Sequence, residues 1–528
     1  MDCILTLDQI IPRAARLYAD KTAFKYLKQS ITYRELDDKT NQLANYLLAK
    51  GLTKGDRVGV FLPRCIEIPI AIYGILKAGA AFVPLDSNMP VSRLDHIIKD
   101  CQITMLVCAK STTKKIEALL ATCDHLLLTI GLEEKLASDL HQNVTWNELE
   151  AKAKKEAPGL RIMASDLAYI MYTSGTTGVP KGIMHTHYSG LSYARLSKQQ
   201  YDVIPDDVIA NHSPLHFDIS TFGYLSSPLA CATTVIISEG HTKFPMSLAQ
   251  LIKKEAITIW YSVPIALIQL SNLDALKTMD IRSVRWVLFG GESYPTKDLL
   301  KLMAIWPNAQ YSNVYGPAEV NQCTFYTVPK TIDEASPIPL GHVWPDTDML
   351  ILDDDDNPVA SGELGKLLIS SSTMMYGYWN NDELSEKGFY YSASEKMKNF
   401  TKRYYRTGDL VRLTAEGLLL FYGRGDRQIK TRGYRVELNE VESALQNISE
   451  IKKAAVFAYT HPDFGKLIGA SIVLNQNSIM DKNKIRNLLA QALPKYCIPE
   501  KINFVESLQR TSAGKVDYKQ LSLDNNEV

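Results

Sequence analysis

The segment Tyr172–Gly182, with the sequence YTSGTTGVPKG, constrains this chain more than any other stretch. Its eleven residues include three glycines, four Ser or Thr side chains and one lysine, and they follow the apolar run Leu167–Met171. A strand that ends in such a loop can bind phosphate, because glycines let backbone N–H groups approach the oxygens and lysine adds positive charge. Gly175, Gly178 and Lys181 lie three residues apart, whereas a Walker loop needs GxxxxGK[ST]. Taken alone, this composition fits a flexible surface loop equally well.

The composition favours a multidomain protein that acts on a small molecule. At 528 residues, the chain is long enough for three or four units of about 150 residues each. Lys and Arg together number 58, as do Asp and Glu, so no net charge favours a nucleic-acid or membrane partner. The N-terminus carries the acidic Asp2, and no apolar run approaches the roughly 20 residues of a membrane span. We therefore expect a cytoplasmic protein. The eight cysteines form no CxxC pair, which argues against zinc and against disulfides.

Helical and strand patterns alternate over most of the chain, which predicts an α/β fold with parallel sheets covered by helices. The predicted helices include Ile66–Lys77 and Ser247–Ala256, and the predicted strands include Ala81–Leu85, Ile257–Ser262, Val284–Phe289 and Gln310–Tyr315.

The pattern changes after about residue 340 to pairs of strands joined by polar turns. Met349–Leu352 and Lys366–Ser370 flank the acidic segment Asp353–Asn357, which we interpret as a hairpin tip rather than a metal site. From Asp426 onward a small α+β unit is predicted. It contains a helix with Val441, Leu445 and Ile448 on one face, strands at Ala454–Ala458 and Gly469–Leu474, and a helix at Asn483–Leu493.

Eight motifs in the same order resemble those of the adenylate-forming superfamily, which includes amino-acid adenylation domains, acyl-CoA synthetases and luciferases. Besides SGTTGxPKG they are LKAGAAFVPLD (Leu76–Asp86), FDIS (Phe217–Ser220), GGE (Gly290–Glu292), NVYGPAE (Asn313–Glu319), YRTGDL (Tyr405–Leu410), GRGDRQIKTRGYRVE (Gly423–Glu437) and TSAGKV (Thr511–Val516). The resemblance covers nearly the whole chain. It implies an N-terminal core over residues 1–425, with stacked parallel αβ layers and a small β-barrel-like subdomain, and a mobile α+β domain over residues 426–528.

The chemistry implied by the resemblance is attack of a carboxylate on the α-phosphate of ATP, followed by transfer of the acyl group to a thiol. Two anions must meet, so cations and Mg²⁺ are expected. Glu319 matches the Mg²⁺ ligand, Lys181 the phosphate-loop lysine, Lys515 the catalytic lysine and Asp426 the hinge. The positions that match ATP contacts are Thr173, Ser174, Gly175, Thr176, Thr177, Gly178, Gly291, Asn313, Tyr315, Gly316, Asp409, Phe421 and Arg424.

Three predicted strands end at Tyr261, Gly290 and Val314, and ligands bind at the carboxyl ends of strands in open α/β sheets. Asp218 matches the carboxylate that pairs with the substrate's amino group in amino-acid-activating enzymes. An unpaired buried carboxylate is unfavourable, so Asp218 favours an amino acid over a simple acid. The matched pocket positions are Asp218, Ile219, Phe222, Tyr261, Leu288, Gly290, Val314, Gln322 and Cys323.

This set is similar to the pocket of stand-alone L-prolyl-carrier-protein ligases, although Gly290, Val314 and Gln322 are less typical of that group. The resemblance implies a substrate that is uncharged and small to medium in size, with L-proline as the best match. Nothing like the HHxxxDG motif of a condensation domain precedes the core, and little chain follows Lys515. We therefore expect transfer to the phosphopantetheine of a separate carrier protein, in the biosynthesis of a natural product such as an antibiotic or toxin.

Besides another small uncharged amino acid as the substrate, two alternatives stay open. One is an acyl-CoA synthetase, which would depend on CoA rather than on a carrier protein. The other is an inactive nucleotide-binding regulator on the same fold, against which the joint presence of Lys181, Glu319, Asp409 and Lys515 speaks.

Overall fold

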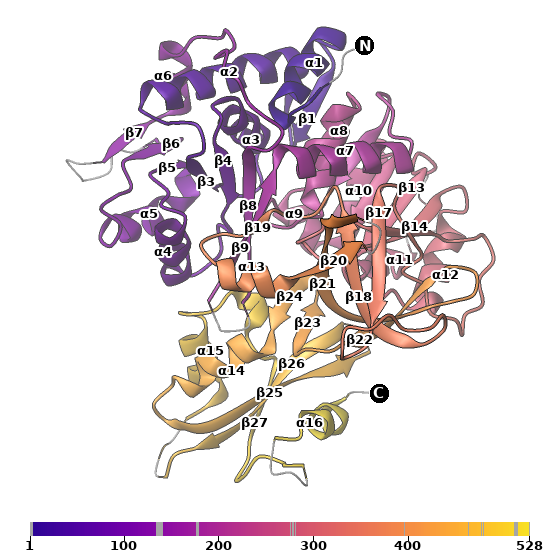
Figure 1. Cartoon of the computed structure of the whole chain (residues 1–528). Coiled ribbons are helices and arrows are strands. Elements are labelled where there is room, and N and C mark those ends of the chain that lie inside the picture. The colour runs from indigo at the N-terminus through magenta and orange to yellow at the C-terminus, as the bar shows by residue number, and fades with distance from the viewer. Residues whose placement is uncertain are drawn as a thin grey trace. The chain divides into compact units, whose positions relative to one another are not determined.

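The computed structural model describes residues 4–133, 141–175, 179–274, 276, 279, 281–394, 397–462, 464–476, 478, 480–511 and 516–526. The chain forms two compact units (Figure 1). The first comprises Met1–Ser87, Ile98–Met171 and Gly182–Gly425, and the second comprises Asn88–Ile97, Tyr172–Lys181 and Asp426–Val528. Both contain helices and strands, which confirms the α/β class predicted from sequence. None of the described helices is long and apolar enough to cross a membrane.

An eight-stranded sheet has the order β19-β9-β8-β4-β3-β5-β6-β7. The strands from β8 to β7 run parallel, and β19 pairs antiparallel with β9. Strands β4 and β5 are buried along their whole length, as expected for parallel strands covered on both faces. The strands are β3 (Arg57–Phe61), β4 (Ala81–Pro84), β5 (Met105–Cys108), β6 (Leu128–Ile130), β7 (Gln142–Val144), β8 (Leu167–Thr173), β9 (Lys181–Thr186) and β19 (Gly377–Tyr378).

A nine-stranded sheet has the order β16-β15-β14-β13-β12-β10-β11-β1-β2. Its inner strands are parallel, whereas β2, β15 and β16 pair antiparallel at its two edges. Strand β14 has the predicted bounds, and β12 and β13 each begin two residues later than predicted. The strands are β1 (Thr22–Tyr26), β2 (Gln29–Thr32), β10 (Val208–Asn211), β11 (Thr233–Ile236), β12 (Ile259–Ser262), β13 (Trp286–Gly290), β14 (Gln310–Tyr315), β15 (Thr324–Thr327) and β16 (His342–Val343).

Several helices of the N-terminal part begin at capping boxes, in which a Ser or Thr side chain and the residue three positions on satisfy each other's backbone N–H groups. Examples are Thr32 with Glu35 before α2 and Thr145 with Glu148 before α6. The helices are α1 (Ile10–Leu17), α2 (Tyr33–Ala49), α3 (Glu67–Lys77), α4 (Val91–Asp100), α5 (Thr113–Leu120), α6 (Trp146–Lys152), α7 (His187–Gln200), α8 (Ser227–Leu229), α9 (Glu239–Lys243), α10 (Pro245–Lys254), α11 (Pro264–Ser271), α12 (Thr296–Ile305) and α13 (Asp382–Gly388).

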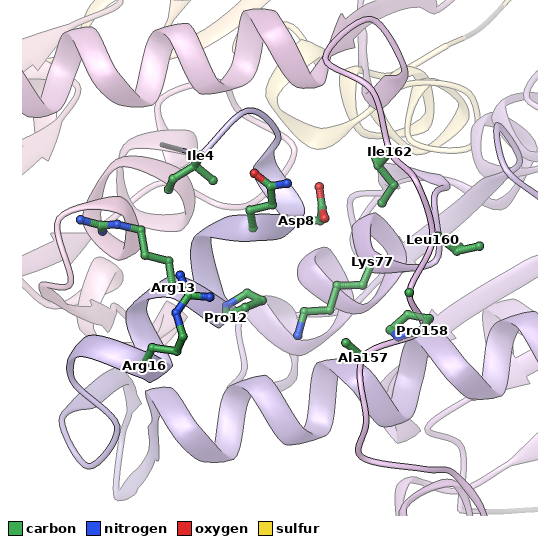
Figure 2. Close-up of a pocket in the computed structure, with 12 residues that line it drawn as sticks. Ile4, Asp8, Pro12, Arg13, Arg16, Lys77, Ala157, Pro158, Leu160 and Ile162 are labelled. Carbon is green, nitrogen blue, oxygen red and sulfur yellow. The ribbon is translucent and has the colours of Figure 1, made fainter. Parts of the chain in front are cut away.

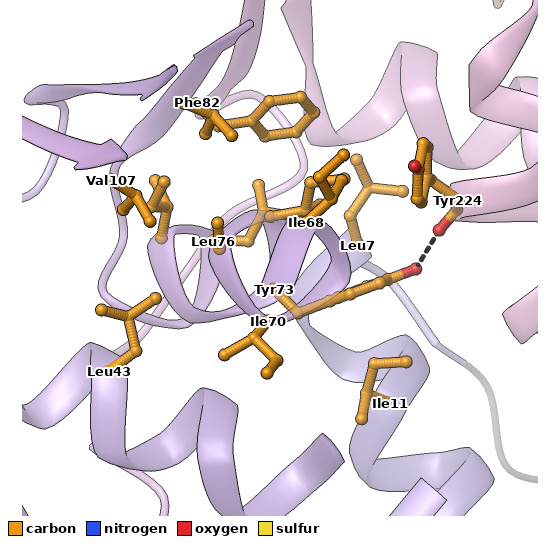
Figure 3. Packing of buried hydrophobic residues seen from close by; sticks show 14 of the residues in the cluster. Leu7, Ile11, Leu43, Ile68, Ile70, Tyr73, Leu76, Phe82, Val107 and Tyr224 are labelled. Atoms are coloured by element: carbon orange, nitrogen blue, oxygen red, sulfur yellow. Dashed lines mark hydrogen bonds between the residues drawn. The ribbon is translucent and has the colours of Figure 1, made fainter. Parts of the chain in front are cut away.

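Helix α3 lies at the centre of the largest apolar cluster, which Figure 3 shows. A Cβ atom at Gly74 would lie 2.6 Å from the side chain of Leu43, so only glycine permits this approach of α3 to α2. On the other side of α3 the Tyr73 hydroxyl donates a hydrogen bond of 2.7 Å to the carbonyl oxygen of Tyr224. The cluster thus connects α3 with the segment that precedes β11, to which Tyr224 belongs.

A five-stranded antiparallel sheet forms the predicted small β subdomain, with β18 and β21 as its inner strands. Its strands are β17 (Thr347–Leu352), β18 (Leu364–Ser371), β20 (Phe389–Ser394), β21 (Met397–Leu413) and β22 (Leu419–Arg424). The hairpin tip predicted at Asp353–Asn357 is confirmed. The Asp353 carboxylate accepts hydrogen bonds of 2.9 Å from the N–H groups of Asp355 and Asn357, and Asp356 forms a bidentate ion pair with Arg406.

The segment after Asp426 has the predicted α+β composition. Strand β25 pairs antiparallel with β26, which pairs in parallel with β27. The last predicted helix ends earlier than expected, at Leu489 instead of Leu493, and a 3₁₀ turn begins after Pro494. The elements are β23 (Gln428–Thr431), β24 (Tyr434–Glu437), α14 (Leu438–Gln446), β25 (Ile451–His461), β26 (Gly465–Leu474), α15 (Lys482–Leu489), β27 (Lys501–Phe504) and α16 (Tyr518–Asn525).

We predict that Tyr73→Ala lowers the free energy of unfolding by about 3–5 kcal/mol, because it empties a fully buried ring site. Urea denaturation followed by circular dichroism measures this loss. Tyr188→Ala is the matched control, since the Tyr188 side chain is 54% exposed. Equal denaturation midpoints for the two variants would contradict the role assigned to this cluster.

Candidate active site

The loop after β8 is the predicted phosphate loop, and it does follow a buried strand. Ser174 is buried, and a Cβ atom at Gly175 would lie 2.0 Å from the carbonyl oxygen of Val179, so this backbone approach requires glycine. Lys181 is the first residue of β9. Three of the predicted phosphate contacts, Thr176, Thr177 and Gly178, lie outside the described residues, as does Lys515.

Glu319 lies in a tight loop that follows β14 and is fully buried. The loop folds back on itself so closely that a Cβ atom at Gly316 would lie 1.7 Å from the carbonyl oxygen of Asn321. Asn321 itself has a φ of +58°. Oε1 of Glu319 accepts a hydrogen bond of 2.8 Å from the Tyr378 hydroxyl, and the Glu319 carbonyl oxygen accepts one of 2.7 Å from the Met375 N–H. Both the carboxylate and the backbone of Glu319 are therefore held in place.

His185 fixes the same loop from β9. Burial lowers the pKa of His185 to about 4, so the ring is neutral near pH 7. Its Nε2 lies 2.9 Å from the carbonyl oxygen of Ala318, which can only accept, so Nε2 carries the proton and donates it. The imidazole thus acts as a rigid support for the residue beside Glu319.

Tyr315, Asp409 and Arg424 meet at the end of β14. Asp409 and Arg424 are paired residues of β21 and β22, and their side chains form an ion pair of 2.7 Å. The Tyr315 hydroxyl donates to the other oxygen of Asp409. Burial raises the pKa of Tyr315, and the negative charge of Asp409 raises it further. The structure therefore brings together three residues that the motifs assign to adenosine.

Three other predicted ATP-binding residues lie within or directly after strands β14, β13 and β22. Asn313 precedes Tyr315 by two residues on β14, and its amide donates a hydrogen bond of 2.7 Å to the carbonyl oxygen of Pro339. Gly291 follows β13 with a φ of +89°, a conformation that favours glycine. Phe421 on β22 is 40% exposed.

Five of the predicted substrate residues pack together. Phe222, Tyr261, Leu288 and Val314 belong to one buried group, the Tyr261 cluster, and Ile219 packs at its edge. The cluster also contains Tyr193 and Trp344, which the sequence analysis missed.

The remaining predicted substrate residues lie around this cluster. Gln322 donates a hydrogen bond of 2.6 Å from Nε2 to the Tyr261 hydroxyl, and a Cβ atom at Gly290 would lie 2.2 Å from the carbonyl oxygen of Val314. Asp218 directly precedes Ile219, which packs against the cluster, and its carboxylate accepts a hydrogen bond of 2.9 Å from the Ile219 N–H. Burial raises the pKa of Tyr261. Cys323 is buried in a neighbouring group with Ile183 and Leu367.

A cavity of about 350 Å³ lies elsewhere in the first unit and shares no residue with the predicted ATP and substrate sets (Figure 2). The amine of Lys77, one of its lining residues, already donates to Asp37, Thr40 and Asn41. The cavity also presents Asp8, Arg13 and Arg16 together with apolar residues such as Ile162.

Among the described residues, no group of three or more His, Cys, Asp or Glu side chains could hold a metal. Mg²⁺ that binds together with a nucleotide takes one or two carboxylates from the protein, and phosphate oxygens and water fill its remaining positions. The buried carboxylate of Glu319 meets this requirement. The residues present thus fit Mg²⁺ bound together with ATP.

Comparison with known proteins decides the family. The profile of the AMP-binding enzyme family matches residues 11–379, and that of the AMP-binding enzyme C-terminal domain matches residues 440–515. The chain belongs to the AMP-binding enzymes, within the adenylate-forming superfamily.

Two L-proline--[L-prolyl-carrier protein] ligases match over nearly their full length. The one from Pseudomonas fluorescens is 30% identical, covering 95% of both chains, and the one from Streptomyces coelicolor is 32% identical, covering 94% of this chain and 92% of that ligase. Gramicidin S synthase 2 of Brevibacillus brevis is 32% identical over 98% of this chain, but the match spans only 11% of that synthase.

Solved structures of AMP-binding enzymes share the fold. The amide bond synthetase McbA of Marinactinospora thermotolerans superposes with a TM-score of 0.87 at 22% identity over 99% of this chain and 100% of McbA. An artificially fused adenylation and PCP di-domain from Klebsiella oxytoca gives 0.80 at 21% identity over 95% of this chain and 94% of its own. These likenesses show the large N-terminal and small C-terminal domain arrangement of the fold.

We predict that Gly316→Ala displaces the Glu319 loop, because the added methyl would overlap the Asn321 carbonyl oxygen. The free energy of unfolding should fall by about 1–3 kcal/mol, and AMP should bind more weakly. Thermal unfolding and calorimetry measure both quantities. Gly240→Ala in α9 is the control, since its nearest neighbour, Oγ of Ser238, would lie 3.7 Å away. Unchanged AMP affinity in Gly316→Ala would show that the loop does not contribute to the nucleotide site.

Proposed function

We propose that this protein activates an amino acid with ATP and Mg²⁺ as an aminoacyl-adenylate, releases pyrophosphate, and transfers the aminoacyl group to the phosphopantetheine thiol of a separate carrier protein. The observation that carries the proposal is Asp218 next to Ile219, which packs against the buried Tyr261 cluster. The similarity to two prolyl-carrier-protein ligases over nearly their full length supports the same activity.

The nucleotide is bound by residues at the ends of β14, β21 and β22. Asp409, fixed by Arg424 and Tyr315, presents a carboxylate for the ribose hydroxyls. Glu319 would hold Mg²⁺, which would supply electrostatic stabilisation of the phosphate charge in the transition state. The phosphate loop with Lys181 binds the leaving pyrophosphate, and Lys515 bridges the substrate carboxylate and the α-phosphate. The hinge at Asp426 lets the domain over residues 426–528 bring Lys515 to the site and remove it.

Asp218 provides the counter-charge for the substrate's ammonium group. A buried ammonium needs such a partner, because a charge removed from water is strongly unfavourable unless it is paired. The apolar walls formed by Phe222, Leu288 and Val314 suit a compact ring, so L-proline is the proteinogenic amino acid that we propose.

The substrate assignment predicts that L-proline gives the fastest ATP–pyrophosphate exchange among the standard amino acids. Each missing or extra methylene should change kcat/KM by roughly 10–200-fold. Asp218→Asn should abolish exchange with every amino acid, while Asp124→Asn, whose side chain is fully exposed, should leave it unchanged. Faster exchange with alanine, valine or glycine would overturn the proline assignment alone. Exchange only with acids that lack an amino group would also overturn the role of Asp218.

Tyr378→Phe should weaken the contribution of Mg²⁺ to nucleotide binding, because Glu319 loses the hydroxyl that orients its carboxylate. Outer partners of metal ligands typically contribute about 10–100-fold in affinity. Calorimetry of ATP binding with and without Mg²⁺ measures the gain in ATP affinity that Mg²⁺ provides. Tyr404→Phe removes a hydroxyl that donates instead to Asp348 and should leave the gain intact. Equal gains in both variants would contradict the assignment of Glu319 as the metal ligand.

A further inference from the structure

The cavity shown in Figure 2 is separate from the proposed nucleotide and substrate sites. Its lining residues come from the N-terminal residues 4–16, which include most of α1, from Lys77 at the end of α3, and from residues 157–162. Its volume of about 350 Å³ lies in the range of sites for small organic molecules. The charged side chains that line it indicate which kind of molecule fits.

The cavity presents one carboxylate, that of Asp8, whose side chain is 17% exposed. Oδ1 of Asp8 has no hydrogen-bond partner among the described residues. Burial raises the pKa of Asp8, although the charge of Lys77 lowers it. A half-buried carboxylate of this kind is stabilised by a cation that binds beside it.

Two basic side chains close to Asp8 do not supply this cation. The ammonium group of Lys77 donates to three side chains of α2 at 2.6–2.7 Å, which uses its three N–H donors. Nδ1 of His187 lies 3.9 Å from Oδ1 of Asp8, but it accepts a hydrogen bond from the Leu7 N–H. Burial lowers the pKa of His187 to about 4, so this ring is neutral near pH 7. The cation is therefore expected to come from a ligand.

Two arginines of α1 line the same cavity. Figure 2 shows the side chains of Arg13 and Arg16 on one side of Pro12 and that of Asp8 on the other. Nη1 of Arg13 donates to the carbonyl oxygen of Leu229 at 3.3 Å, whereas none of the described residues accepts a hydrogen bond from its Nε or Nη2. Guanidinium groups bind carboxylates through pairs of parallel N–H donors.

The opposite charges separate the possible ligands. A simple anion would be repelled by Asp8, and a simple cation would be repelled by the two arginines, whereas a zwitterion has a favourable partner for each of its charges. The walls also include the apolar side chains of Ile4, Pro12 and Ile162, which suit a hydrocarbon group. An α-amino acid with an apolar side chain combines all three features.

We propose that this cavity binds a free α-amino acid with an apolar side chain, whose ammonium group pairs with Asp8 and whose carboxylate pairs with Arg13 and Arg16. The bound amino acid is a ligand and not a substrate, because none of the predicted catalytic residues lines the cavity. The inference goes beyond the proposed function and does not depend on it, since Asp218 belongs to a different site.

The first test measures the binding of free amino acids by calorimetry, without nucleotide, to the unmodified protein and to Asp218→Asn. The probes are L-valine, L-leucine and L-phenylalanine. At least one of them should bind to Asp218→Asn as well as to the unmodified protein, because Asp218 does not line the cavity. Binding of none of the probes, or binding only to the unmodified protein, would overturn the inference.

Two analogues of the probe that binds most tightly separate its two charged contacts. One analogue carries hydrogen in place of the ammonium group, and the other carries hydrogen in place of the carboxylate. Each should bind to Asp218→Asn roughly tenfold or more weakly than the amino acid, since each loses hydrogen bonds between charged groups. If either analogue binds as tightly as the amino acid, the cavity does not recognise a zwitterion and the inference is wrong.

Substitutions in the cavity, made together with Asp218→Asn, assign each contact. Asp8→Asn should remove the preference for the amino acid over the analogue that lacks the ammonium group. The pair Arg13→Gln and Arg16→Gln should remove the preference over the analogue that lacks the carboxylate. Arg34→Gln, whose side chain is 64% exposed and lies outside the cavity lining, should leave both preferences unchanged. A preference that survives its matching substitution would overturn the inference, even if the overall affinity falls.

Discussion

The buried carboxylate of Glu319 is the constraint on which the rest of the site depends. A fully buried acidic group is unfavourable unless it is hydrogen-bonded and will meet a cation. The protein meets the first need with the Tyr378 hydroxyl and with a loop closed on Gly316. In the proposed function, Mg²⁺ bound together with ATP would meet the second need, so the packing of the loop would influence the affinity for Mg·ATP. His185, kept neutral by burial, supports that loop without adding a competing charge.

Charge in this protein is arranged locally, since the chain as a whole carries a formal net charge of zero. Asp409 is neutralised by Arg424, so its remaining hydrogen-bonding capacity can recognise a neutral ribose rather than attract a cation. Asp218 lies instead next to Ile219, which packs against the tyrosine-rich Tyr261 cluster. In the proposed function Asp409 would bind the sugar, Glu319 the metal and Asp218 the ammonium group. The difference arises from the side chains packed around each of them.

The alternating helix and strand patterns, together with the motifs, were enough to predict the fold class. The glycines of these motifs occupy positions that the backbone requires. Gly175 and Gly316 illustrate this, since a Cβ atom at either would overlap a backbone carbonyl oxygen. Tyr378 and Trp344 were not predicted. Both side chains contact residues that are far away in the sequence. Tyr378, for example, donates a hydrogen bond to Glu319, 59 positions earlier, and no local periodicity predicts such a contact. The end of α15 was placed four residues too late, because the apolar Leu493 continues the pattern of the helix beyond Leu489.

The central claim is that a substrate carboxylate attacks the α-phosphate of ATP, and oxygen labelling tests it most directly. The amino acid, labelled with ¹⁸O at both carboxylate oxygens, is incubated with the protein, Mg·ATP and hydroxylamine, which intercepts the acyl-adenylate at its carbonyl carbon. The account predicts that the AMP released contains one ¹⁸O atom and that unlabelled pyrophosphate is formed in equal amount, as mass spectrometry would show. Unlabelled AMP, or ADP with labelled inorganic phosphate, would contradict the claim.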